Sequence, residues 1–429
     1  MGRTARDRDD RHPRPVKRIE LFEKYPEVRL GVVVVLLLIG MCAFGYSLIS
    51  FLTVDAGWTT IEAGSSEADC SGELIFQYYI GAGELSATAE KKAVKKLYSE
   101  LTKTSYQLFH TSQGFDGVHN LYYINQHPNE EIEVDEMLYE AFSMIEKHGN
   151  RAVYLAPVYV QYSNLFGCND DVETVDFDPY QNEEIARYFA DIASFAGDKD
   201  AIHIQLLGDH RIKLYVSDAY LNYAAENGFS EFIDLYWMKN AFVVDYIADT
   251  MRENGFVMGS ISSYDGFVRN LDGGSGTEYA FNIFDREGTT VYQAGVMRYD
   301  EAMSIVYLRD HPANNSLDWQ HYYEFKNGEI RTAYIDAADG YCKTALNDLV
   351  VYSPDTGCAE ILFQVMPVYV NDQFEARALT RLLQSGIYSI YCDDKVILYN
   401  ESSLVLTDLY DDGEVQYAAK YAVDQDVDR

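Results

Sequence analysis

Acidic side chains are the most numerous groups in this sequence that could do chemistry, and no short standard motif organises them. The 429 residues include 68 Asp and Glu against 34 Lys and Arg. The phosphate-binding pattern G-x-x-x-x-G-K-[ST], the zinc-binding pattern H-E-x-x-H and the nucleophile pattern G-x-S-x-G are absent from the sequence. Two carboxylates could catalyse glycoside hydrolysis, but with so many acidic residues the sequence does not identify a particular pair. The chemistry must therefore be read from longer segments.

An ordered series of segments carries the informative signal. In chain order they are NLYYIN (120–125), GNRAVYLAPV (149–158), DLYWMKNAFVVD (234–245), GSISSYDG (259–266), SLDW (316–319), IDAADGY (335–341) and VVYSPDTGCAE (350–360). Each segment alone is a weak signal. Their order and spacing across roughly residues 73–406 resemble the FAD:protein FMN transferases, the ApbE family.

The resemblance implies a flavin-dependent chemistry. Members of that family are typically membrane-tethered or exported, bind FAD and Mg²⁺, and transfer FMN to a Thr or Ser hydroxyl of a partner protein. By this resemblance the cofactor contacts fall on Asp234, Asp265, Ser316, Asp336 and Gly340. The metal ligands fall on Glu360 and Gln364. No catalytic side chain is assigned.

The chain departs from the family pattern where glycines are expected. The family's D-L-G-x-x-A-K-G-Y keeps its first two residues here, but Tyr236 and Ala241 replace the glycines and Lys239-Asn240 replaces Ala-Lys. A later Gly-Gly step falls on Tyr264-Asp265. Because side chains now occupy space that glycine leaves open, close approach of a dinucleotide to the backbone is expected to be hindered.

The metal and flavin contacts are also altered. Glu360 and Gln364 stand where the family has a metal-binding Asp and Thr, and the flavin-contacting His falls on Ala333. The extra methylene of Glu moves its carboxylate by about one bond, and a displacement near ~1 Å can cost ~100-fold in rate. The amide of Gln364 offers Mg²⁺ only a neutral carbonyl. Both residues are equally compatible with ordinary polar positions on a helix.

We therefore expect a pseudoenzyme that binds a ligand or a partner protein in the ancestral groove. FAD and Mg²⁺ are expected only if activity or binding is retained. One alternative is an active Mg-dependent FAD:protein FMN transferase or an FAD pyrophosphatase. A third class, a surface module for sugars or peptides, rests only on the content of acids and the 36 tyrosines.

One apolar segment predicts a membrane anchor. Residues 30–54 contain no charged side chain over 25 positions, and as a helix at ~1.5 Å per residue they exceed the ~30 Å hydrocarbon core. Residues 1–29 are basic, with 9 Lys and Arg against 6 acids, so the positive-inside rule places them in the cytoplasm and the remainder outside. A cleaved signal peptide is the alternative, but no A-x-A site follows the segment.

The charge and the cysteine content argue against some classes of partner and of site. The 400 residues after Arg29 carry a net charge of −37, which repels nucleic-acid phosphates, so nucleic-acid binding is not expected. Apart from Cys42 in the apolar segment, five cysteines remain and none forms a C-x-x-C pair. A zinc or thioredoxin-type site is therefore disfavoured, while disulfides and unpaired thiols both remain open.

The elements that would position these residues alternate between helix and hairpin. Helices are predicted over 84–110, 135–147, 181–196 and 240–254. Strands are predicted over 201–207, 212–216, 278–285, 290–299, 322–326 and 329–335, with Asn327-Gly328 as the strongest hairpin turn. Neighbouring strands that pair antiparallel indicate an α+β fold. The predicted divisions are a stalk (55–83), the ApbE-like domain (84–406) and a loose acidic tail (407–429).

Overall fold

The computed structural model describes residues 55–64, 69–83, 85–272, 276–315 and 317–422. The predicted cytoplasmic segment 1–29 and membrane helix 30–54 lie outside these residues. No helix within the described ranges is long and apolar enough to cross a bilayer.

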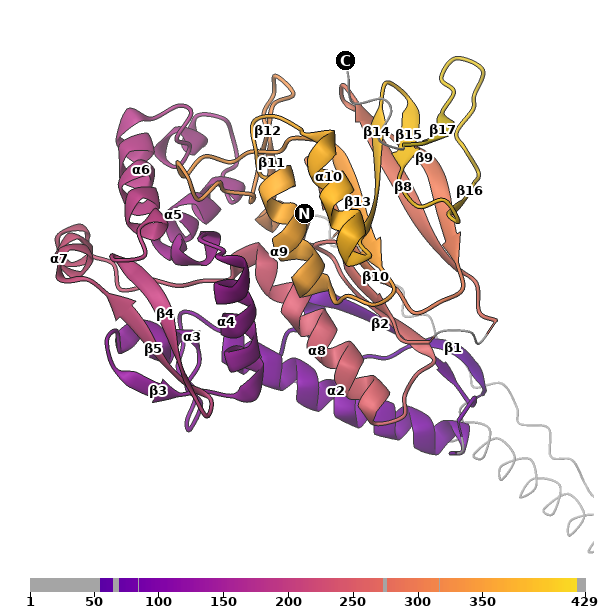
Figure 1. Ribbon diagram of the computed structural model, residues 1–429, viewed down its shortest axis with the longest axis horizontal. Coiled ribbons are helices and arrows are strands. Elements are labelled where there is room, and N and C mark those ends of the chain that lie inside the picture. The colour runs from indigo at the N-terminus through magenta and orange to yellow at the C-terminus, as the bar shows by residue number, and fades with distance from the viewer. Residues whose placement is uncertain (1–54, 65–68, 84, 273–275, 316, 423–429) are drawn as a thin grey trace, which may run out of the picture. The chain divides into compact units, whose positions relative to one another are not determined.

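A long sheet runs through the described part of the chain (Figure 1). Its nine strands, in spatial order, are β1 (Gly57–Thr60), β2 (Leu74–Ile80), β6 (Gly259–Ser263), β7 (Phe267–Asn270), β10 (Ser304–Arg309), β13 (Asp348–Ser353), β14 (Tyr388–Asp393), β15 (Val396–Tyr399) and β17 (Ala418–Tyr421). All neighbours are antiparallel except β15 and β17, which run parallel. The predicted antiparallel α+β architecture is confirmed.

The middle strands of this sheet are covered on both faces. Every residue of β10 and β13 is buried, and both strands are rich in Ile, Leu, Val and Tyr, as strands with two packed faces require. Helices α8 (Lys239–Glu253) and α9 (Cys358–Tyr369) pack against the strands from one side. A core that includes Ile283, Met297 and Tyr352 joins the sheet to a smaller three-stranded sheet of β8 (Tyr279–Glu287), β9 (Thr290–Tyr299) and β16 (Val405–Thr407).

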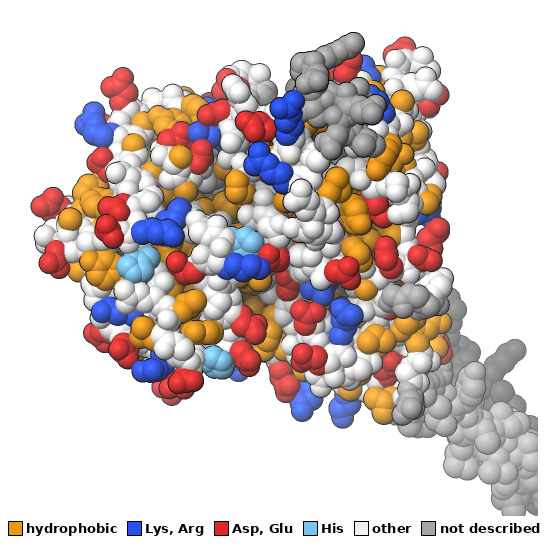
Figure 2. Space-filling model, in the orientation of Figure 1, with side chains coloured by type: hydrophobic (Ala, Val, Ile, Leu, Met, Phe, Trp, Pro, Cys, Tyr) orange, Lys and Arg blue, Asp and Glu red, His pale blue; other side chains and the backbone are white. Residues whose placement is uncertain are grey.

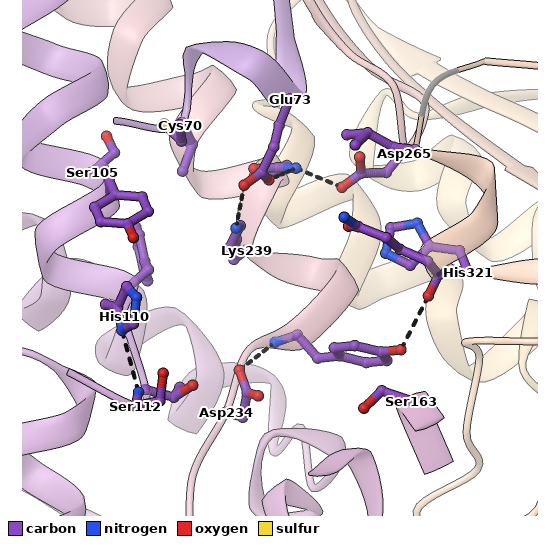
Figure 3. A pocket seen from close by; sticks show the side chains of 18 of the residues that line it. Cys70, Glu73, Ser105, His110, Ser112, Ser163, Asp234, Lys239, Asp265 and His321 are labelled. Carbon is purple, nitrogen blue, oxygen red and sulfur yellow. Dashed lines mark hydrogen bonds and ion pairs between the residues drawn. The ribbon is translucent and has the colours of Figure 1, made fainter. Parts of the chain in front are cut away.

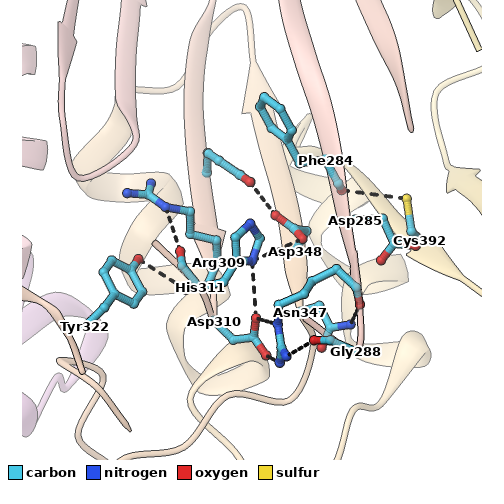
Figure 4. A network of polar contacts seen from close by, with 12 residues as sticks. Phe284, Asp285, Gly288, Arg309, Asp310, His311, Tyr322, Asn347, Asp348 and Cys392 are labelled. Carbon is cyan, nitrogen blue, oxygen red and sulfur yellow. Dashed lines mark hydrogen bonds and ion pairs between the residues drawn. The ribbon is translucent and has the colours of Figure 1, made fainter. Parts of the chain in front are cut away.

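A polar network fastens β8 to the main sheet (Figure 4). The hydroxyl of Tyr307 donates to the buried Asp348, and Arg286 of β8 forms an ion pair with Asp310. The amide of Asn347 donates to the backbone oxygen of Arg286 over 2.7 Å. Burial raises the pKa of Asp348 to about 6. Asp348 and Asp310 are thus charged side chains inside the fold that each have a hydrogen-bond or ion-pair partner, as buried charges require.

Asp245 of α8 fixes the start of α9. Its two carboxylate oxygens accept hydrogen bonds from the backbone N–H groups of Cys358 and Ala359 at 2.8 and 2.9 Å. Arg269 of β7 pairs with the same carboxylate over 2.6 Å. A side chain at Gly357 would lie 2.6 Å from Asp245 Oδ2, so the approach of the two helices depends on glycine there.

The remaining helices form the periphery, together with a second small sheet. They are α2 (Ala87–Phe109), α3 (Leu121–Gln126), α4 (Glu136–His148), α5 (Ala156–Phe166), α6 (Glu183–Gly197), α7 (Asp218–Asn227) and α10 (Ala376–Leu382). The sheet orders β3 (Glu131–Glu133), β5 (Arg211–Val216) and β4 (Ile202–Gly208), and β11 (Tyr322–Glu324) pairs with β12 (Ile330–Thr332). Figure 1 shows the sheet of β3, β5 and β4 beside α4 and α7, away from β14 and β15.

Local signals identified these elements well. Asp135 caps α4 by accepting from the N–H of Met137 at 2.9 Å, and Gly149 ends that helix with φ of 62°. The predicted apolar stripe of α8 is buried, and Gly255 follows the helix with φ of 80°. The β4–β5 and β11–β12 hairpins form as predicted, the second around Gly328 with φ of 86°.

Two predicted boundaries need correction. Residues 55–83 are not a separate stalk, because β1 and β2 are strands of the main sheet and β2 pairs with β6. The tail predicted at 407–429 is not loose over its described part, since β17 pairs with β15 and Tyr417 is buried. The sequence indicates a strand at 73–79, and β2 forms there, but its pairing with β6 could not be predicted because the two strands are distant along the chain. The strand β17 has only four residues, AAKY, which give no clear strand pattern.

Gly266 closes the turn that carries Asp265 and provides a test of this packing. It has φ of 103°, and a Cβ there would overlap the carbonyl oxygen of Tyr307. Gly266→Ala is expected to lower the free energy of unfolding by ~3 kcal/mol or more in urea titrations, because strain and overlap add. Gly255→Ala is the matched control, since it has positive φ but nothing within 4 Å, and should cost only ~1 kcal/mol. Equal losses in the two variants would contradict the packing described.

Candidate functional site

A cavity of about 470 Å³ opens where several distant segments meet. It is lined by the residues just before β2, the C-terminal end of α2 and the residues that follow it, one residue of α5, the start of α8 and the turn before it, the β6–β7 turn and the segment 317–321 (Figure 3). Asp234 shapes one wall, because its carboxylate accepts from the N–H of Tyr236 at 2.8 Å in an Asx turn. This turn leads directly into α8.

Four polar side chains form the centre of the cavity. Lys239 Nζ lies 2.8 Å from one oxygen of Glu73. The amide nitrogen of Asn240 donates to the other oxygen of Glu73 at 2.9 Å and to Asp265 at 2.7 Å. Because both neighbours of that amide are carboxylates, the orientation of Asn240 is fixed with its nitrogen toward them. Figure 3 shows Lys239 of α8, Glu73 just before β2 and Asp265 of the β6–β7 turn converging on the cavity.

Burial sets the charge state of these carboxylates. Burial, reinforced by the negative charge of Glu73, raises the pKa of Asp265 to about 7. Burial also raises the pKa of Asp234 to about 6. Burial alone would lower the pKa of Lys239, but the adjacent Glu73 outweighs it and the pKa rises. The cavity at neutral pH therefore holds one internal ion pair and an Asp265 close to its midpoint of ionisation.

Tyr236 occupies space that a glycine would leave open. Its backbone has φ of 44°, in the left-handed region that favours glycine. Its ring stacks on Tyr159 with centroids 4.7 Å apart, and its hydroxyl lies 3.4 Å from the backbone oxygen of Gln320. His321 meets the ring edge-on at 6.0 Å. Burial lowers the pKa of His321 to about 4, so this imidazole is neutral at pH 7.

The predicted metal ligands lie elsewhere, in the first two turns of α9. Lys147 Nζ is 2.9 Å from both oxygens of Glu360, and His148 Nε2 is 2.9 Å from one of them. The amide nitrogen of Gln364 donates to the same carboxylate at 3.0 Å. Burial would raise the pKa of Glu360, but the hydrogen bonds and charges of Lys147 and His148 outweigh it and lower the pKa.

These residues do not fit Mg²⁺. That ion takes oxygen ligands, whereas Glu360 already faces an ammonium and an imidazole, and Gln364 turns its nitrogen toward the carboxylate. Across the described ranges, no three His, Cys, Asp or Glu side chains converge in a way that could hold a metal ion. The cluster is neutralised by side chains of the chain itself.

Two of the predicted cofactor residues, Asp336 and Gly340, fall outside the cavity. Asp336 pairs with Lys343 over 2.8 Å, and Lys343 also contacts Asp339 and Asp372 at 2.7 and 3.1 Å. Gly340 closes the same turn with φ of 80° and packs against α6. The predicted Ser316 lies outside the described residues. Of the four that are described, Asp234 and Asp265 share the cavity, and their cofactor contacts stay predictions.

Sequence reasoning missed the groups that surround these two aspartates. Glu73 was assigned to a stalk, and Cys70, Tyr106 and His110 lie in no recognised motif, yet all four line the cavity. One signal was available: Lys239-Asn240 places two polar residues directly before the buried apolar run Ala241–Val244 of α8. Such a pair requires polar partners when buried, and Glu73 is that partner.

The raised pKa of Asp265 predicts a pH-dependent stability. Between pH ~4 and ~7 the folded chain keeps a proton that the unfolded chain has lost, so its stability falls as pH rises and the loss is complete above pH 7. Asp265→Asn should therefore raise the free energy of unfolding at pH 8 by ~2 kcal/mol, with a smaller effect at pH 4. Urea titrations at both pH values measure this. Asp116→Asn, at an exposed loop position, is the control and should show no such pH-dependent difference; equal behaviour of the two variants would refute the assignment.

Solved structures show the same fold. The ApbE protein of Thermotoga maritima matches with a TM-score of 0.50 and 13% identity, over 82% of this chain and 97% of the other. The flavin transferase ApbE of Vibrio cholerae matches with a TM-score of 0.51 and 13% identity, over 82% and 98%. No family profile and no curated protein sequence matches this chain. The predicted resemblance is confirmed at the level of the fold, which is that of the ApbE flavin transferases.

Proposed function

We propose that this protein is a pseudoenzyme that keeps the ApbE-type fold as a binding module and no longer transfers FMN. The observation that carries the proposal is the environment of Glu360. Its carboxylate is engaged by Lys147 and His148 at 2.9 Å, where the resemblance places a metal ion. The cavity beside Glu73 and Asp265 is the proposed binding site, for a small ligand or a segment of a partner protein.

The electrostatics of the metal position support loss of transfer. Nucleotide transfer from FAD needs a cation that neutralises the pyrophosphate and the developing phosphoryl charge. A lysine ammonium that is already paired with a carboxylate attracts a substrate phosphate only weakly. It is also a point charge and, unlike a metal ion, cannot coordinate several oxygens at once. Mg²⁺ would first have to displace the Lys147 ammonium and the His148 imidazole from Glu360.

The turn into α8 supports the same proposal. Tyr236 keeps a left-handed backbone yet fills the cavity wall with a ring stacked on Tyr159. Ala241 is fully buried in α8. A dinucleotide that approached the backbone here would meet the phenol ring of Tyr236. The ring of Tyr236, which lines the cavity, offers an apolar surface to a smaller ligand.

We further propose that residues 30–54 anchor the protein in the cell membrane, with residues 1–29 in the cytoplasm and the body in the extracytoplasmic space. The apolar length and the basic residues before it support this topology. A partner protein in that space, rather than a nucleic acid, fits the acidic composition. On the face drawn in Figure 2, Lys and Arg occur scattered among Asp and Glu.

An assay of FAD turnover tests the loss of transfer. The purified full-length chain, in dodecyl maltoside with FAD, Mg²⁺ and a Thr-containing acceptor, should release no AMP above the protein-free background and leave no fluorescent flavin on the acceptor. Vibrio cholerae ApbE is the positive control under identical conditions. AMP release that disappears in Glu360→Ala would establish an active enzyme. Attachment of flavin to the acceptor would then identify a transferase, and AMP with free FMN a pyrophosphatase.

A metal titration tests the physical reason. The wild-type chain should show no saturable Mn²⁺ binding by electron paramagnetic resonance at millimolar concentration. Lys147→Ala with His148→Ala removes the ammonium and the imidazole from Glu360 and should create measurable binding, because an uncompensated carboxylate attracts a divalent ion. Adding Glu360→Ala to that variant is the matched control and should abolish the gain. Tight binding by the wild type would contradict the proposal.

Membrane extraction tests the anchor. The full chain should remain with membranes at pH 11 in carbonate, whereas a chain lacking residues 30–54 should be released, since ~20 apolar residues suffice to span a bilayer. Protease added outside intact cells should digest the body of the full chain. Release of the full chain, or protection of its body, would refute the proposed anchoring or orientation respectively.

A further inference from the structure

The cavity beside Glu73 extends past the turn that contains Trp319. A second cavity of about 580 Å³ lies against the end of α5 and the 3-10 turn Glu173–Asp176. The two cavities share Ser163 and Trp319 as lining residues. The two cavities thus adjoin at Trp319, and we call them together the Trp319 groove.

Aromatic rings dominate the apolar lining of this groove. Trp319 is 62% exposed, compared with 47% for Trp58 and 3% for Trp237. An exposed indole beside a cavity offers a ligand a large apolar ring face. Tyr106 and Tyr236 line the same cavity, so the groove can present ring faces to a ligand from more than one side.

Uncompensated carboxylates provide the polar lining. Lys239 forms an ion pair with Glu73. Within the described residues, no Lys or Arg lies at ion-pair distance from Asp234 or Asp265. Glu173 and Asp176 line the far part of the groove. The groove thus combines exposed aromatic faces with excess negative charge.

Two buried acceptor atoms of the cavity lack hydrogen-bond partners. Asp265 is 9% exposed and its Oδ1 has no hydrogen-bond partner, and Oδ1 of the 2% exposed Asn240 has none either. Both residues line the cavity. Buried polar atoms are normally satisfied, so the site lacks a donor or a positive charge. Lys239 already shows that an alkylammonium is stable here, at 2.8 Å from Glu73.

We propose that the Trp319 groove binds an organic cation, an ammonium group that packs against the indole of Trp319 and faces the carboxylates of Asp234 and Asp265. Cation–π attraction is strongest for Trp and grows when the pair is desolvated. The same carboxylates repel the pyrophosphate of a dinucleotide. This inference rests on the proposed function as a binding module and names the class of its ligand.

The test compares choline with its neutral isostere. Isothermal titration of the full-length chain in dodecyl maltoside, which carries no charge, should show saturable binding of choline and at least ~10-fold weaker binding of 3,3-dimethyl-1-butanol, because the two differ only in the positive charge. FAD is titrated in parallel. Equal affinities for choline and the alcohol, or no choline binding at millimolar concentration, would overturn the inference.

Variants locate the site. Trp319→Ala removes an exposed ring and should weaken choline binding by ~10-fold, and Asp265→Asn should weaken it through loss of charge at a buried position. Trp58→Ala is the control, an exposed indole outside the groove, and should bind as the wild type does. Unchanged binding in both groove variants would refute the assignment. Saturable FAD binding with AMP release would instead overturn the proposed function, whereas failure of choline alone leaves that proposal standing.

Discussion

The buried carboxylate of Asp245 holds three elements in one arrangement. It receives the first N–H groups of α9, pairs with Arg269 of β7 and belongs to α8. Each of its oxygens is satisfied by a donor, which is the condition under which a buried charge is tolerated. Because α8 begins with Lys239 and α9 begins just before Glu360, this single carboxylate fixes the distance and angle between the cavity and the Glu360 cluster.

The two polar sites show a common solution to the same electrostatic problem. In each, a carboxylate that burial would penalise is neutralised by a lysine from a distant part of the chain: Lys239 for Glu73 and Lys147 for Glu360. A covalently attached ammonium is always present at high effective concentration, whereas a free metal ion must be recruited and desolvated. In both places the negative charge of the carboxylate is therefore met by a side chain of the same chain.

The elements that sequence alone predicted are those with local determinants. The N-cap of α4, the apolar stripe of α8 and the Asn327-Gly328 turn all act within a few residues, so their signals survive in the sequence. The two polar sites have no such local signal, because Glu73 and Lys239 are 166 residues apart and Lys147 and Glu360 are 213 residues apart. The family resemblance placed Asp234 and Asp265 in one region, but it could not reveal which cations would meet the carboxylates. Those pairings exist only after the chain has folded.

The parallel pairing of β17 with β15 has a consequence for association between molecules. All four residues of β17 are exposed, and the strand covers a backbone edge that would otherwise present unpaired N–H and C=O groups. Open edges invite the strands of neighbouring copies. Here the last described strand returns from beyond β16 and carries Lys420, a type of side chain that discourages further strand addition. β17 is itself the outermost strand on this side of the sheet, and its short length and its lysine disfavour pairing with a neighbouring copy.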